Sequence, residues 1–287
     1  MQASAVPDVQ WWIQQLSSLT TAGKCAAPQF LKPYHFVTTA LAVKRSKFTS
    51  LNLPDNLRNY AIRMHLWEAA GLPDPTSVGA NPEGKRFLPV EALRDRNAVA
   101  ASASKLALIA GNNGADAATV NSLETALMEI LENCFAHAQM DDELWGLACA
   151  QTWPKGNKAQ IAIADSGVGI RNSLRDNLLL AQRLAEENSC EMATQYGVTG
   201  KPGKGHSGYG LTLSRQLLEG NGGTLIIVSH DEYFCSSNGH TSSGKLMSPW
   251  LGTVVMLEWN TDRPLDVTAV YNGWPLPEGM TDGDFDL

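Results

Sequence analysis

Hydrophobic and polar residues alternate with helical spacing between residues 122 and 139. On a helix, positions four apart share a face, so Glu129, Asn133 and His137 form one polar line. The neighbouring face is apolar and carries Leu123, Leu127, Ile130, Leu131, Cys134 and Ala138. This pattern predicts an amphipathic helix packed on a core, with a carboxylate and a carboxamide at the edge of that core.

The first part of the chain predicts a different set of elements. Residues 33–45 predict a helix, residues 48–53 a strand, and residues 54–70 a second helix. Proline and glycine make residues 72–85 the expected linker. Residues 86–110 then predict a strand followed by an alanine-rich helix.

Short apolar runs and polar turns alternate in the second half of the chain. Residues 159–164 predict a buried strand, residues 211–218 a helix and residues 252–257 a closing strand. Residues 233–248, rich in Ser, Gly and Asn, predict a hairpin or a loop insertion between strands.

A first glycine motif follows the strand at residues 159–164. Asp165 comes directly after the strand, and Gly167 and Gly169 follow it. A carboxylate before a turn without side chains can accept a hydrogen bond from an adenine amino group while the backbone closes over the ring. An ordinary Asx or glycine turn has the same pattern and is common, so this motif alone favours the turn.

A second glycine motif precedes the helix at residues 211–218. Its glycines leave backbone amides free, and Lys204 adds positive charge. Together with the N-terminus of the following helix, these groups can bind one anion. The glycines are Gly203, Gly205, Gly208 and Gly210. No apolar strand leads into this motif, which argues against a dinucleotide fingerprint, and no segment fits the P-loop pattern.

The polar line on the first helix has the chemistry of a metal–phosphate site. Mg²⁺ bound to phosphate takes an oxygen ligand from the protein, several waters and a base near one of them, and Asn133 and Glu129 offer these groups. An amphipathic helix with Glu and Asn at its rim is the alternative for the helix alone. The two glycine motifs that follow favour a nucleotide site.

Taken together, the ordered motifs resemble the GHKL superfamily of gyrase, heat-shock chaperone, histidine kinase and MutL ATPases. The resemblance covers roughly residues 114–260 and implies ATP and Mg²⁺ as ligands. It also implies an α+β fold, a two-layer α/β sandwich of the Bergerat type, with a smaller N-terminal α/β segment. The matching motifs are the N-box at 129–133, the glycine boxes at 165–170 and 205–211, Gly222-Gly223-Thr224, and the strand at 252–257.

The resemblance implies a role for individual residues. Asn133 would coordinate magnesium, Asp165 would read the adenine, and Thr253 would support the adenine side through a water. His137 falls where relatives place a nucleotide-contacting side chain, although a solvated histidine is the alternative. Residues 171–202 resemble the ATP lid, which is expected to order when nucleotide binds. The remaining nucleotide-binding residues would be Gly167, Gly169, Ile170, Lys204, Gly205, Gly208, Tyr209, Gly210 and Leu211.

Glu129 separates subfamilies within this resemblance. Sensor histidine kinases usually have Asn at this position, whereas the ATPases and anti-sigma serine kinases have Glu, which can take a proton from water or from a substrate hydroxyl. We therefore expect a Mg-dependent ATP-binding protein with slow ATPase activity that acts as a nucleotide-controlled regulatory switch for a protein partner. The alternatives are a serine/threonine kinase of the anti-sigma type acting on a separate partner, and a nucleotide-binding module without turnover.

A histidine kinase would need a phosphoacceptor histidine upstream. His35 and His65 are the upstream candidates, but neither has a His-Glu pair or a long helical hairpin around it, so both are interpreted as structural. The N-terminal helix, strand, helix order faintly resembles a degenerate STAS-like module; a family-specific extension packed on the ATPase sheet is the alternative. The expected domains are residues 1–84, residues 85–262 and an acidic tail at 263–287.

Composition limits the class of protein. A hydrophobic fraction of 44% and a net charge of -7 over 287 residues predict a folded globule, and the acidic balance argues against nonspecific nucleic-acid binding by the whole chain. A local basic groove stays open. Five widely spaced cysteines indicate neither a disulfide framework nor a zinc site, and no apolar run reaches a membrane span. We expect a cytoplasmic protein without a clear nucleic-acid site, whose partners are ATP and a protein encoded nearby; a homodimer stays open.

Overall fold

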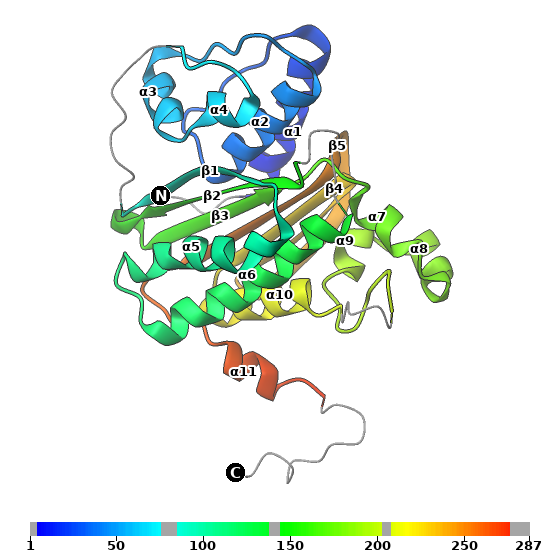
Figure 1. Cartoon of the computed structure of the whole chain (residues 1–287). Coiled ribbons are helices and arrows are strands. Elements are labelled where there is room, and N and C mark those ends of the chain that lie inside the picture. The colour runs from blue at the N-terminus through cyan, green and yellow to red at the C-terminus, as the bar shows by residue number, and fades with distance from the viewer. Residues whose placement is uncertain (1–4, 76–84, 138–143, 203–207, 276–287) are drawn as a thin grey trace.

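The computed structural model describes residues 5–75, 85–137, 144–202 and 208–275. These residues form a five-stranded antiparallel sheet in the order β1-β2-β3-β5-β4, with helices on both faces (Figure 1). The expected α+β fold of the GHKL type is confirmed. The strands are β1 (Phe87–Leu93), β2 (Gly146–Trp153), β3 (Lys158–Ala164), β4 (Thr224–Ser237) and β5 (His240–Asn260).

One layer of helices covers the lower face of the sheet in Figure 1. It consists of α5 (Val99–Gly111), α6 (Ala117–His137) and α10 (Gly210–Asn221). Side chains alternate between the two faces of a strand, so Ile161 and Ile163 of β3 enter this core while Ala162 enters the opposite one. The amphipathic helix expected at 122–139 corresponds to the part of α6 from residue 122 to its end at His137, and the apolar stripe from Leu123 to Cys134 is buried here. Residues 138 and 139 lie outside the described residues.

A second layer of helices covers the other face and turns the sandwich into three layers (Figure 1). It consists of α1 (Val6–Ala22), α2 (Pro33–Arg45), α3 (Asp55–Arg63) and α4 (Leu66–Ala70). Every residue of α2 from Pro33 to Val43 is buried, as is typical of a helix enclosed on all sides. These helices share one hydrophobic core with Cys149, Ala162 and Val254 of the sheet.

The prediction of a strand at residues 48–53 is wrong, because these residues form an irregular connection. Phe48 and Leu51 still pack against the helical core. A short segment with this pattern of apolar residues can form either a strand or a loop that packs on the core, and the sequence does not distinguish the two. The helix expected at 54–70 is two helices, since His65 interrupts it with a φ of 55°. The N-terminal segment is therefore helical rather than α/β. A STAS-like module, which needs strands, does not fit residues 5–75, whereas an extension packed on the sheet does.

A long hairpin joins β4 and β5, as expected for residues 233–248. Asn238 and Gly239 have φ values of 50° and 76°, which suit the tight turn that an Asn-Gly pair favours between antiparallel strands. The hairpin extends both strands beyond the region in which β5 pairs with β3.

The beginning of the expected acidic tail is folded onto the domain. Leu265 is buried, and its N–H bonds to the Thr119 hydroxyl of α6 at 3.3 Å. Helix α11 (Val267–Asn272) follows, with Asp266 as its N-cap. Residues 276–287 and the central part of the expected linker, 76–84, lie outside the described residues, and the expected domain boundaries stay a prediction. Among the described residues, no helix combines the length and the apolarity that crossing a membrane requires.

Candidate functional site

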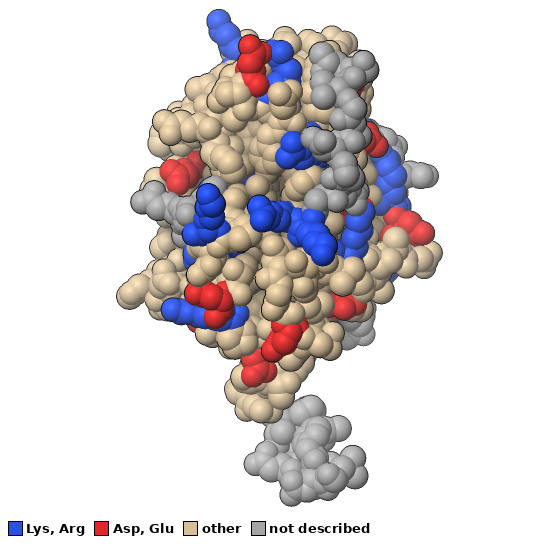
Figure 2. Space-filling model, turned by 90° about the vertical axis from the view of Figure 1, so that its left-hand side faces the viewer, with Lys and Arg blue, Asp and Glu red and all other residues tan. Residues whose placement is uncertain are grey.

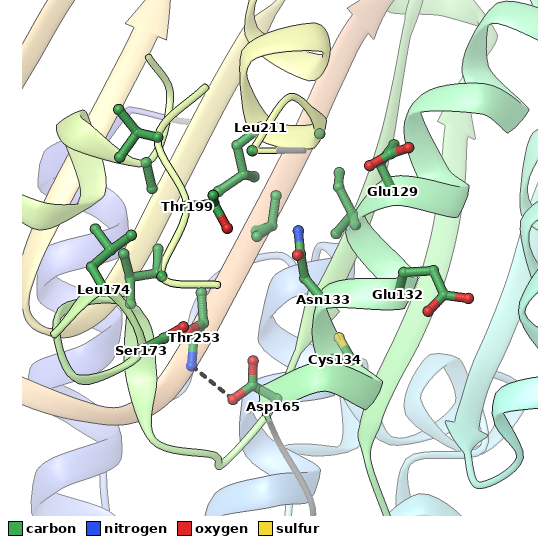
Figure 3. A pocket seen from close by; sticks show the side chains of 18 of the residues that line it. Glu129, Glu132, Asn133, Cys134, Asp165, Ser173, Leu174, Thr199, Leu211 and Thr253 are labelled. Atoms are coloured by element: carbon green, nitrogen blue, oxygen red, sulfur yellow. Dashed lines mark hydrogen bonds between the residues drawn. The ribbon is translucent and has the colours of Figure 1, made fainter. Parts of the chain in front are cut away.

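A cavity of about 290 Å³ lies between α6, the end of β3 and the start of α10 (Figure 3). The residues expected to form the site come from four separate segments of the chain, and the fold brings most of them to this one place. Those that line the cavity are Glu129, Asn133, Asp165, Gly169, Ile170, Gly208, Tyr209, Gly210, Leu211 and Thr253.

Four of the expected residues are not part of this lining. Gly167 contacts Asp165 instead of the cavity, because its N–H donates to Asp165 Oδ1 at 2.7 Å. His137 is the last residue of α6, and its side chain lies outside the described part of the chain. Lys204 and Gly205 also lie outside it, so their roles, like that of His137, stay predictions.

Asp165 is held rigidly at the end of β3. Its Oδ1 accepts the N–H groups of Gly167 at 2.7 Å and Thr253 at 3.2 Å, and its other oxygen points into the cavity (Figure 3). Burial raises the pKa of this carboxyl to about 7, although both backbone hydrogen bonds act to lower it. Asp165 therefore offers one preoriented acceptor whose charge changes near neutral pH.

The polar line of α6 faces the same cavity. The side chains of Glu129 and Asn133 project from successive turns of the helix (Figure 3). Within the described residues, the Asn133 carboxamide has no hydrogen-bond partner, so its oxygen is available to a ligand. Gly210 lets the first turn of α10 approach Glu129, since a Cβ on Gly210 would lie only 2.7 Å from the Cβ of Glu129. The positive end of α10 thus lies beside this carboxylate.

The first glycine box is packed directly on β4. Gly169 has a φ of 74°, and a Cβ there would lie 2.2 Å from the His230 ring. The Ile170 N–H donates to the Ser229 hydroxyl at 2.8 Å, and the His230 ring bonds to the Val168 carbonyl at 2.9 Å. Glycine is needed here for both the backbone conformation and the close approach.

The expected lid supplies the wall opposite α6. It contains the short helices α7 (Gly169–Leu174), α8 (Ala181–Glu186) and α9 (Ser189–Met192), with a 3₁₀ turn, η3 (Leu178–Leu180), between α7 and α8. Whether this segment orders when a ligand binds stays a prediction. Its contributions to the cavity are Ser173, Leu174, Ala193, Val198, Thr199 and Gly200.

An ion pair between half-buried Arg171 and buried Glu232 joins the lid to the sheet. Arg171 donates to both carboxylate oxygens of Glu232 on β4, at 2.5 and 3.0 Å, and Ser189 also bonds to this carboxylate. Burial by itself would raise the pKa of Glu232, but the hydrogen bonds from Arg171 and Ser189 lower it to about 2. Glu232 therefore stays charged and fixes the base of the lid.

Comparison with known proteins identifies this arrangement. A family model described as the histidine kinase-like ATPase domain matches residues 92–220, which include α6, both glycine boxes and the lid. Residues 92–220 form a histidine kinase-like ATPase domain. The expected GHKL superfamily is confirmed, and with it ATP binding in general terms.

The chain is also similar to a curated relative, the circadian input-output histidine kinase CikA of Synechococcus elongatus. The two are 27% identical over 138 residues, which cover 48% of this chain and 16% of that relative. The chain therefore spans only a small part of that relative's length.

Two charged residues of the ATPase domain's cavity were not predicted from the sequence. Arg96, in the 3₁₀ turn η1 (Arg96–Ala98) after β1, donates from Nε and Nη2 to Glu132 Oε2 at 3.1 and 2.8 Å. Both side chains line the cavity. Glu132 belongs to the N-box and could have been selected on that ground, whereas nothing in the sequence around Arg96 distinguishes it from a surface arginine.

An aromatic cluster beside the cavity joins the lid of the ATPase domain and Tyr209 to the C-terminal segment. The Tyr196 ring from the lid stacks on Tyr209 of the second glycine box, with centroids 4.4 Å apart. Trp274 contacts both rings, at 5.1 and 5.3 Å, and its indole N–H donates to Gln216 on α10 at 2.5 Å. The segment expected to be a tail is thus part of the wall around the second glycine box.

Neither upstream histidine has the setting of a phosphoacceptor. His35 is buried in α2, where its Nδ1 accepts the Lys32 N–H at 2.9 Å, and burial lowers its pKa to about 3. His65 lies at the break between α3 and α4, both of which are short. These positions agree with the structural interpretation of both residues.

Proposed function

We propose that the ATPase domain binds ATP together with Mg²⁺, hydrolyses it slowly, and uses the nucleotide state to control binding of a protein partner. The observation that carries this proposal is the order of three side chains along one cavity. Asp165 lies at the inner end, Asn133 lies in the middle, and Glu129 lies beside the first turn of α10.

The inner end of the cavity suits a purine. The free oxygen of Asp165 can accept a hydrogen bond from the adenine amino group, while Oδ1 is already occupied by backbone N–H groups. Ile163 and Val255 line the cavity here and are almost fully buried, so they offer apolar walls to the ring. A pocket of this kind combines apolar area with one orienting polar group.

The middle of the cavity suits a metal ion that is bound mainly through phosphate. Among the described residues, no group of three or more His, Cys, Asp or Glu could hold a metal by itself. Magnesium does not need one, because it retains waters and is often bound by only one or two protein oxygens plus phosphates. The carboxamide of Asn133, which has no hydrogen-bond partner within the described residues, fits that requirement, and a bound Mg²⁺ would neutralise charge on the phosphates.

The outer end of the cavity suits proton transfer. Glu129 can take a proton from a water directed at the terminal phosphate, and the amides of the first turn of α10 can stabilise the negative charge that develops. Residues of the lid and Tyr209 line the cavity together with Glu129. These features support slow, base-assisted hydrolysis.

An experiment on Asn133 tests the proposed metal and nucleotide site. We expect Asn133→Ala to weaken ATP binding in the presence of Mg²⁺ by roughly tenfold or more. Removing even a residue that only holds a metal ligand in place commonly lowers metal affinity by about that factor. Isothermal titration with ATP in Mg²⁺ and in EDTA measures the effect, which should be small in EDTA. Asn121→Ala, an exposed position on the same helix, is the matched control. Equal Mg²⁺ dependence in Asn133→Ala and the wild type would contradict the assignment.

The fate of the transferred phosphate distinguishes hydrolysis from protein phosphorylation. We expect ATP labelled at the γ-phosphate to release free phosphate in the presence of the protein encoded by a neighbouring gene. Label retained on a serine or threonine of that protein would instead support the kinase. ATP binding without any release or transfer would support a module that only binds nucleotide.

Trp274 provides a test of the aromatic cluster. We expect Trp274→Ala to lower ATP affinity by roughly three- to tenfold, since two aromatic contacts worth about 0.5–1.5 kcal/mol each no longer hold the lid against Tyr209. Isothermal titration measures the change. Trp11→Ala on α1, which removes a partly exposed tryptophan away from the cavity, should leave the affinity unchanged. An unaltered dissociation constant for Trp274→Ala would show that the cluster does not support the pocket.

A further inference from the structure

The end of β3 opposite the ATP cavity carries a surface that combines cations with aromatic rings. The strand runs from Lys158 at this surface to Ala164, next to Asp165, so the two sites are roughly 20 Å apart at about 3.3 Å per residue. We call it the basic–aromatic surface. Its residues are Phe30, Arg63, Lys85, Arg86, Lys155 and Lys158.

Phe30 is the exposed ring of this surface. It is 40% exposed, and its centroid lies 6.1 Å from that of Tyr60 and 6.3 Å from that of Trp153. Trp153 pairs directly with Lys158 across the β2–β3 hairpin, and directly paired residues project to the same face of a sheet. Phe30 therefore lies close to the Lys158 side chain as well as to two supporting rings.

Arg63 continues the same surface on the other side of Tyr60. Its guanidinium lies 5.8 Å over the ring of Phe87, which pairs with Gln151 two residues before Trp153. The Tyr60 hydroxyl bonds to the Gln151 side chain and fixes α3 against these strands. A continuous strip thus runs from Arg63 across Tyr60 and Phe30 to Lys158.

Among the described residues, no carboxylate forms an ion pair with the cations of this surface. Arg63, Lys85, Arg86 and Lys155 are exposed, Lys158 is half-buried, and none of the five forms an ion pair within the part of the chain that the structure describes. Asp262 lies nearby, but its hydrogen bond at 3.2 Å is with the neutral Asn157 amide and not with one of these cations. Figure 2 shows this end of the molecule, where Lys and Arg gather across the middle of the face. The net charge of -7 therefore conceals a local positive surface.

We propose that the basic–aromatic surface binds a single strand of nucleic acid. Proteins that bind single strands combine cations along the phosphate backbone with aromatic rings on which unpaired bases stack. Arg63 and Lys155 would contact phosphates on either side of a base stacked on Phe30. An acidic peptide would use the cations but not an exposed ring, and a duplex would keep its bases away from Phe30.

Fluorescence anisotropy with a labelled 20-nucleotide oligothymidylate at low salt tests this proposal. We expect the wild-type chain to bind and the double variant Arg63→Glu/Lys155→Glu to bind at least about tenfold more weakly, with a smaller dependence on salt. Lys47→Glu is the matched control, because Lys47 is exposed beyond the C-terminal end of α2 whereas Phe30 precedes its N-terminal end. At 13 residues that helix separates the two by roughly 20 Å.

Phe30→Ala separates stacking from charge. We expect it to weaken oligothymidylate binding by roughly fivefold or more, as loss of one stacked base does, while heparin binding stays unchanged. Asp165→Asn should retain oligonucleotide binding, because the ATP cavity lies at the other end of β3. Circular dichroism melting checks that each variant is folded.

Several results would overturn the proposal. One is the absence of binding by the wild type, and another is equal binding by the Arg63→Glu/Lys155→Glu variant. Equal affinity for a blunt duplex, or an oligothymidylate affinity that Phe30→Ala does not change, would show that only charge is recognised. Tighter binding of an acidic peptide than of the oligonucleotide would indicate a protein partner instead.

Discussion

Glu129→Gln should bind ATP about as tightly as the wild type but hydrolyse it at least about 100-fold more slowly, the usual contribution of a general base. Glutamine keeps the size of the side chain but cannot take a proton from water. The contact with Gly210 involves Cβ of Glu129, which the substitution preserves, so the first turn of α10 should stay in place. Phosphate release gives kcat, and isothermal titration gives the affinity.

The matched control for this experiment is Glu124→Gln. Glu124 lies on the same helix but bonds to Ser104 rather than lining the cavity, so its variant should hydrolyse ATP at the wild-type rate. A wild-type rate for Glu129→Gln would show that Glu129 is not the base. Parallel loss of binding and hydrolysis would instead assign Glu129 a structural role.

Asp165→Asn should weaken ATP binding by roughly 10- to 100-fold, the range expected when a hydrogen bond to a charged group is lost. The oxygen of the introduced asparagine can still accept the N–H groups of Gly167 and Thr253, which leaves its NH₂ group facing the cavity. Two donors then meet where the carboxylate had accepted the adenine amino group. Isothermal titration with ATP measures the loss.

GTP provides an internal control for this substitution. Guanine carries a carbonyl where adenine carries the amino group, so the NH₂ group of the introduced asparagine should favour it, and the preference for ATP over GTP should fall sharply. Equal losses for both nucleotides would indicate general damage to the pocket. An undiminished ATP affinity would remove Asp165 from the adenine site.

The raised pKa of Asp165 adds a dependence on pH to the same prediction. Protonation near pH 7 places the hydrogen on the oxygen that faces the cavity, because Oδ1 already accepts two N–H groups. ATP affinity should therefore rise as the pH rises from 6 to 8 in the wild type and stay constant in Asp165→Asn. Titration at several pH values tests this, and a pH dependence that survives in the variant would assign it to another group.

The stability that Asp165 contributes should change with pH in the opposite direction to ATP affinity. An unfolded aspartic acid titrates near pH 4, so between about pH 4 and 7 the folded protein binds more protons at Asp165 than the unfolded chain does. The free energy of unfolding contributed by this residue is therefore highest below pH 4 and falls as the pH rises through 7. Urea denaturation at pH 5 and pH 8 should reveal this loss in the wild type but not in Asp165→Asn.

Local patterns predicted the elements around the site correctly. The spacing of Glu129 and Asn133 beside an apolar stripe requires a helix at the border of a core, and α6 has that position. Asp165 at the end of an apolar run, and Gly210 at the start of a helical pattern, mark the same boundaries in the structure. The sequence predicts these elements because the spacing of hydrophobic residues in a helix or a strand is a local property of the chain.

The N-terminal segment shows where such patterns fail. Phe48, Leu51 and Leu53 suggest a strand, but these side chains are half-buried against helices, and an apolar side chain can be covered in this way in a strand or in a loop. The third layer was missed for a similar reason, since α2 is buried on all sides and its own sequence does not show which elements enclose it. Arg96 lines the cavity and Trp274 packs on Tyr209 of its wall, and both come from segments that are distant in sequence from every site motif.

The sequence by itself determined the helix, the strand end and the two glycine boxes, because the chemistry of each is carried by residues within a few positions of one another. The tertiary structure alone decided that these motifs share one cavity, that Asp165 is buried enough to titrate near pH 7, and that helices cover both faces of the sheet. It also brought Phe30, Arg63 and Lys158 together on one surface. Such outcomes depend on contacts between distant segments and on the exclusion of water, which no local pattern encodes.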